Sequence, residues 1–191
     1  MGIMNCGSSG VNGTGLACGN PLSSLILLQM MGAPQNVRDH IVRWFENTYL
    51  PTNQAYEDFR SGTWTAAGAG FSGSNSPLNN APKVKPETMT CHGAHTRWKA
   101  AAGSWIAVHG ADRANHDRCR KSTYATVHHL VEIINTWKAG GAVSGALDPG
   151  IATCRTPACH GGTYPTGGAS GKMKCAPCHS SLAAVVPGHG M

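Results

Sequence analysis

The sequence has few charged residues, few aromatic residues and no long hydrophobic run. Asp, Glu, Lys and Arg together make up 13% of the 191 residues, and aromatic residues make up 6%, with three Phe. A large aliphatic core is therefore not expected. The longest apolar runs, 25–28 and 182–186, are far too short to cross a bilayer, so we expect no membrane-spanning segment. Full disorder is excluded, because 41% hydrophobic residues and five Trp require burial.

The N-terminus lacks the features of an export signal. Residues 1–15 have neither the basic stretch nor the apolar stretch of a signal peptide, so the sequence is either cytoplasmic or a processed mature form. The net charge is +6, but the Lys and Arg residues are scattered along the chain. Without a basic run, a nucleic-acid partner is not expected.

Hydrophobic spacing predicts four helices joined by much coil, and no convincing strand. The expected helices cover 21–31, 36–49, 96–109 and 122–138, with Thr96 as the N-cap of the third. The apolar face of the second comprises Val37, Ile41, Trp44, Phe45 and Thr48. The apolar face of the fourth comprises Val127, Leu130, Val131, Ile134 and Trp137. Secondary structure alone would not organise residues 145–191, which are rich in Gly, Pro and Ala.

Cysteine and histidine are the abundant reactive residues, with eight Cys and ten His. The segment Cys175-Ala-Pro-Cys178-His179 has the C-x-x-C-H spacing that attaches c-type haem. The two thiols add to the porphyrin vinyl groups, and the histidine becomes an axial ligand of the iron. Cys154 and Cys159-His160 repeat the pattern with four residues between the thiols. Three Cys are followed directly by His, where chance predicts about 0.4 such pairs.

A third, incomplete motif is Thr88-Met-Thr-Cys91-His92-Gly-Ala-His95. Thr88 stands where the first Cys would be. A haem here would be attached through Cys91 alone, or also through a Cys distant in sequence, of which Cys119 is the nearest candidate. His92 would be the proximal iron ligand.

These motifs, which cover about 150–180 and the Cys91 site, resemble those of multihaem c-type cytochromes. The resemblance implies two or three haem c groups, attached after export, and therefore a periplasmic or extracellular location. It also implies a mainly α fold with extensive coil, in which a few helices pack around covalently bound haems, with little or no β-sheet. The surplus histidines suit bis-histidine ligation, which leaves no open iron position. The candidates for the distal ligands are His128, His129, His95, His109, His116, His40 and His189, with Met173 and Met191 ranked lower.

Other interpretations of the cysteines remain open. Cys154, Cys159, Cys175 and Cys178 also fit a four-thiolate zinc ribbon, although zinc does not explain the histidine after each pair. Two disulfides among the same four residues are a further alternative. Outside this group, a Cys6–Cys18 disulfide is plausible, and a Cys91–Cys119 disulfide competes with haem attachment at Cys91.

The sequence therefore predicts an electron carrier rather than an enzyme, although a haem peroxidase or reductase subunit is an alternative. Residues 1–87 are expected to be a haem-poor helical and coil region that offers an assembly surface, and 88–191 to be the haem-binding region. The low charge and coil content resemble subunits of extracellular cytochrome filaments, and a monomeric periplasmic shuttle is the alternative. Its partners would be other redox proteins or copies of itself.

Overall fold

The computed structural model describes residues 11, 14–54, 57–58 and 81–146, and only the backbone of 111–117. Its helices are α1 (Gly19–Met30), α2 (Gln35–Asn47), α4 (Cys91–Ala101), α5 (Gly103–His109) and α6 (Ala111–Lys138). In these ranges the only β-structure is two isolated bridges. The expected mainly helical fold is confirmed. None of the described helices is long and apolar enough to cross a membrane.

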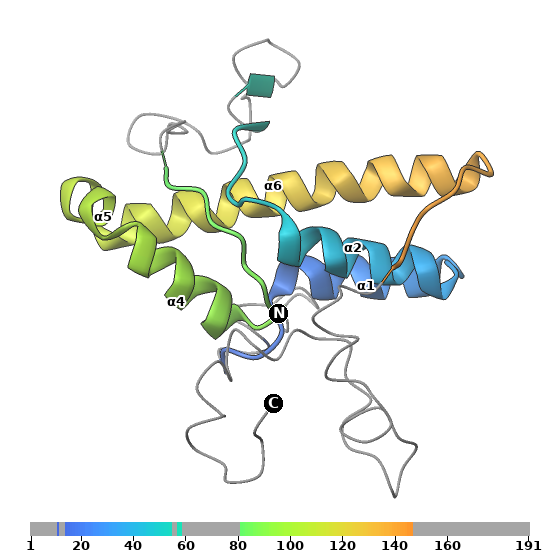
Figure 1. Cartoon of the computed structure of the whole chain (residues 1–191), viewed down its shortest axis with the longest axis horizontal. Coiled ribbons are helices and arrows are strands. Elements are labelled where there is room, and N and C mark those ends of the chain that lie inside the picture. Colours follow the sequence, from blue (N-terminus) through green and yellow to red (C-terminus); the bar gives the residue numbers. More distant parts are fainter. Residues whose placement is uncertain (1–10, 12–13, 55–56, 59–80, 147–191) are drawn as a thin grey trace, which may run out of the picture.

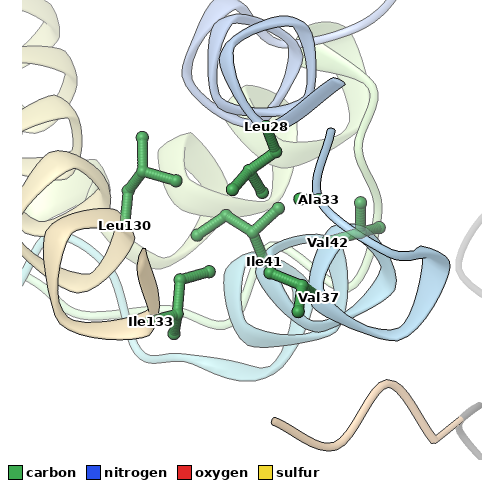
Figure 2. Packing of buried hydrophobic residues seen from close by; sticks show 7 residues of the cluster. All are labelled: Leu28, Ala33, Val37, Ile41, Val42, Leu130 and Ile133. Atoms are coloured by element: carbon green, nitrogen blue, oxygen red, sulfur yellow. The ribbon is translucent and has the colours of Figure 1, made fainter. Parts of the chain in front are cut away.

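The main hydrophobic core lies between α1, α2 and α6, which run side by side (Figure 1). Figure 2 shows Leu28 from α1, Ile41 from α2 and Leu130 from α6 directed toward one another. Val37 and Ile41 are fully buried, which follows from their spacing along α2. Core contacts thus join helices from both sides of the predicted boundary at residue 87.

A second cluster stabilises α4 and α5. In Figure 1 α4 slants away from α1 and α2, and α5 lies against α6. Trp98 is fully buried, and its ring meets that of Trp105 edge-on at a centroid distance of 6.1 Å. The indole Nε1 of Trp98 donates a 2.7 Å hydrogen bond to the carbonyl oxygen of Pro82. This bond ties α4 to the segment that precedes it.

The third predicted helix differs from the structure at its start and in its middle. Helix α4 begins at Cys91 rather than near Thr96, and the chain breaks at Ala102 before α5. The N-cap is Thr90, whose hydroxyl accepts a hydrogen bond from the Gly93 amide. The sequence did not predict an N-cap at Thr90, because Cys91 and His92 interrupt the apolar periodicity at the start of this helix.

The fourth predicted helix is longer and rotated relative to the prediction. Helix α6 begins at Ala111, immediately after Gly110, whose positive φ of 81° reverses the chain. Leu130 and Ile133 are buried, but Val127 and Val131 are 51% and 50% exposed. The predicted apolar face was therefore wrong in part, because small and polar residues occupy much of the interior face. The buried residues described on α6 are Arg118, Lys121, Ser122, Ala125, Thr126, Leu130 and Ile133.

The Thr90 cap gives a testable stability difference. Replacing Thr90 by Ala leaves an amide in the first turn of α4 without its acceptor, and we expect a loss of about 1 kcal/mol in unfolding free energy. Thr90→Ser, which keeps the hydroxyl, should retain most of that stability. Urea unfolding followed by circular dichroism measures both, and equal losses in the two variants would contradict the capping role.

Candidate haem attachment site

Two segments that are distant in sequence meet at the start of α4. Ala17 and Thr90 form an antiparallel bridge. The amide of Cys18 donates to the Met89 carbonyl oxygen at 2.7 Å, and the amide of Cys91 donates to the Leu16 carbonyl oxygen at 2.6 Å. These backbone hydrogen bonds fix the chain before α1 against the chain that enters α4.

The thiols of Cys18 and Cys91 lie together at this junction. Both are free and half-buried, and the Cys18 thiol donates a hydrogen bond to the Cys91 sulfur. This hydrogen bond, assisted by the positive charge of Arg118, lowers the pKa of Cys91 to about 6. The same bond, together with burial, raises the pKa of Cys18. The pair therefore combines one nucleophilic thiolate with one thiol.

Gly93 in the first turn of α4 has no room for a larger side chain. A Cβ on Gly93 would come within 2.7 Å of the Thr90 Oγ1 atom and 2.8 Å of the Thr88 Cγ2 atom. Thr88 itself is fully buried. The position at which a continuous motif would carry its first Cys thus faces the interior, and Cys18 supplies a thiol from another segment.

Arg118 of α6 lies on the other side of this junction. Its guanidinium is buried, with Nη1 at 3.5 Å from the Nδ1 atom of His95 and at 3.8 Å from the Cys119 sulfur. Burial and the positive charge of Arg118 lower the pKa of His95. The imidazole of His95 is consequently neutral near pH 7.

The side chains at the junction match the groups that attach and ligate a c-type haem. Cys18 and Cys91 provide two reduced thiols side by side, and His92 follows directly in the chain with an exposed side chain. The amide of His92 donates to the Gly15 carbonyl oxygen at 2.9 Å, so its backbone is fixed with the thiols. Two thiols and one adjacent imidazole are the groups that covalent haem attachment uses.

Three predictions about cysteine pairing differ from the structure. The distant thiol beside Cys91 belongs to Cys18, whereas Cys119 was the expected candidate. Cys119 is exposed on α6 and is free, so the alternative Cys91–Cys119 disulfide is absent from the described residues. Cys18 is also a free thiol, which contradicts a Cys6–Cys18 disulfide; Cys6 lies outside the described residues.

The structure brings two of the predicted distal histidines together between α2 and α6. The Nε2 atoms of His40 and His129 are 3.1 Å apart, while His128 is exposed next to them. Burial lowers the pKa of His129. His109 ends α5 with its ring 4.4 Å from that of Trp105. These four residues lie on α2, α5 and α6, whereas the thiol pair lies at the starts of α1 and α4.

The remaining predicted residues lie outside the part that the structure describes. This applies to both complete motifs and to the C-terminal histidine. The residues concerned are Cys154, Cys159, His160, Cys175, Cys178, His179 and His189. Nothing is described of the side chain of His116 in α6.

Known proteins resemble this chain in fold alone. No protein-family model and no curated protein sequence matches it. Its structure is similar to that of the split-Soret cytochrome c from Desulfovibrio desulfuricans, whose description concerns a novel iron centre. The TM-score is 0.70 at 19% sequence identity, over 97% of this chain and 71% of that chain. The similarity shows that the chain shares its fold with that solved protein.

Proposed function

We propose that this chain transfers electrons through covalently attached haem c groups, one of which is bound by Cys18 and Cys91. The observation that carries the proposal is the pairing of these two free thiols beside His92. The two thiols would form thioethers with the vinyl groups, and the imidazole of His92 would bind the iron. Such a haem supplies an iron that cycles between the ferric and ferrous states, and it therefore carries one electron.

The surrounding residues support attachment at this junction. Thioether formation requires a reactive sulfur, and the hydrogen bond from Cys18 and the charge of Arg118 stabilise the thiolate of Cys91. The exposed position of His92 leaves its ring accessible to a planar group. Similarity to a solved cytochrome c adds support from the fold.

Two further haems belong to the same proposal, at Cys154–Cys159–His160 and Cys175–Cys178–His179. Together with the Cys18–Cys91 site they would give three haems per chain. Bis-histidine ligation would keep each iron low-spin and closed to substrates, as an electron carrier requires. Among the remaining histidines, His95, His109, His116, His128 and His189 are candidates for the distal ligands.

Mass measurement of the denatured haem-loaded protein tests the proposal. We expect an increment of three haem groups, because thioether bonds survive denaturation. Peptide mapping should recover one haem that joins the peptides containing Cys18 and Cys91. A colourless protein with bound zinc would instead support the four-cysteine ribbon. A high-spin ferric signal that shifts on addition of cyanide would indicate an open iron position and an enzyme.

The proposal extends to the location and assembly of the chain. Covalent haem attachment implies a compartment outside the cytoplasm. If copies of the chain stack, the particles are filaments. If the chain acts as a monomeric shuttle, the particles are small and discrete. Electron microscopy of the purified protein distinguishes them, because discrete particles at all concentrations would exclude the filament.

A further inference from the structure

A pair of histidines outside the thiol junction has an arrangement that the proposed function does not use. His40 of α2 and His129 of α6 face each other, with their Nε2 atoms 3.1 Å apart and their ring centroids 5.3 Å apart. Trp44 stacks on His129 with a centroid distance of 4.5 Å. The cluster thus consists of three side chains, two from α2 and one from α6, and these two helices pack against each other.

The Nδ1 atom of each imidazole ring lies within hydrogen-bonding distance of an oxygen acceptor. The Nδ1 atom of His40 lies 2.7 Å from the carbonyl oxygen of Ser144, which can only accept. The Nδ1 atom of His129 lies 3.0 Å from a carboxylate oxygen of Glu132. Both Nδ1 atoms must therefore donate, which places the lone pair of each neutral ring on Nε2. Two lone pairs then face each other, an arrangement that a shared proton or a metal cation between them stabilises.

We infer that His40 and His129 form a binding site for a divalent transition-metal cation of the zinc, nickel or copper class. Imidazole nitrogens suit these ions. Two Zn–N bonds at a tetrahedral angle place the nitrogens about 3.4 Å apart, within a few tenths of an ångström of the observed separation. Glu132 and the Ser144 carbonyl hold the rings in the orientation that such ligands commonly have.

The protein supplies two ligands to this site. A hollow of about 160 Å³ borders His129 and is lined also by His128 and Glu132, whereas His40 does not line it. The described residues contain no group of three His, Cys, Asp or Glu side chains poised around one ion, so water or an exogenous ligand completes the coordination. Binding is therefore expected to be reversible, as at an exchangeable surface site.

Calorimetric titration of the haem-loaded protein with Zn²⁺ tests this inference. Zinc is colourless and redox-inert, so the haem bands stay readable during the titration. We expect one equivalent to bind, with an affinity that falls at least tenfold in His40→Ala and in His129→Ala. Glu132→Gln should weaken binding by about 10- to 100-fold, because it removes the carboxylate that orients His129. Val108→Ala, at an exposed position of α5, is the control and should bind zinc as the unaltered protein does.

Two results would overturn the inference. The first is zinc binding that is equal in the unaltered protein and in the His40→Ala, His129→Ala double variant. The second is a change from low-spin to high-spin haem in either single variant, which would assign that imidazole to a haem iron. Neither result depends on how many haems are attached, so loss of this site and loss of the proposed function are separable.

Discussion

Replacing Cys18 and Cys91 together by alanine is expected to remove one covalently bound haem from each chain. Cys18→Ala alone should leave the haem tethered by a single thioether, because Cys91 and His92 remain. One vinyl group then stays conjugated with the porphyrin, which moves the pyridine haemochrome band of that haem to longer wavelength. Mass measurement counts the haems, and the haemochrome spectrum reports the number of thioethers.

Cys119→Ala provides the matched control for this result. Cys119 is a free cysteine near the same junction, but its side chain is exposed on α6. Its removal should change neither haem mass nor haemochrome position. An unchanged haem count in the Cys18→Ala, Cys91→Ala variant would refute attachment at this junction while leaving the two complete motifs untouched.

Replacing Trp98 by alanine is expected to produce the largest loss of stability among the substitutions considered. Trp98 is 1% exposed and donates a hydrogen bond to the Pro82 carbonyl. Removing so large a buried ring costs about 3–5 kcal/mol. That is a large part of the roughly 5–15 kcal/mol by which a domain is stable. Urea unfolding of the haem-loaded protein, followed by far-ultraviolet circular dichroism, measures the change.

Two other variants make the stability result specific. Val108→Ala, at a position that is 78% exposed, should change the unfolding free energy by less than about 0.5 kcal/mol. Trp98→Phe keeps an aromatic ring but loses the hydrogen bond to Pro82, so it should fall between the two alanine variants. Equal stability of Trp98→Ala and Val108→Ala would show that α4 is held by something other than this ring.

The sequence predicted the helices best where apolar residues follow a helical period. Val37, Ile41 and Phe45 of α2 are buried as their spacing indicates. The prediction failed where polar residues form the helix, as at the start of α6. Apolar residues at a helical period predict only those helices that bury one face. The first turns of α6 are polar, so they lack this pattern, and they follow Gly110, which has a positive φ.

The candidate site could be predicted only in part from the sequence. The adjacency of Cys91 and His92 identified half of it, and the missing first Cys signalled a partner elsewhere. Cys18 could not be selected, because its place beside Cys91 depends on backbone hydrogen bonds between segments that share no local pattern. The Cys119 candidate rested on distance along the chain, which does not measure distance in the fold.

The bridge between Ala17 and Thr90 has a consequence for the order of maturation. A contiguous motif can receive its porphyrin while the polypeptide is still unfolded, because one short turn presents every reacting group. Cys18 and Cys91 become neighbours only after the two segments have paired, so the proposed haem attachment at this position would follow folding. Once made, the link would close a ring of about 70 residues and act as a staple, worth about 4 kcal/mol if it restricts the unfolded chain as a disulfide does.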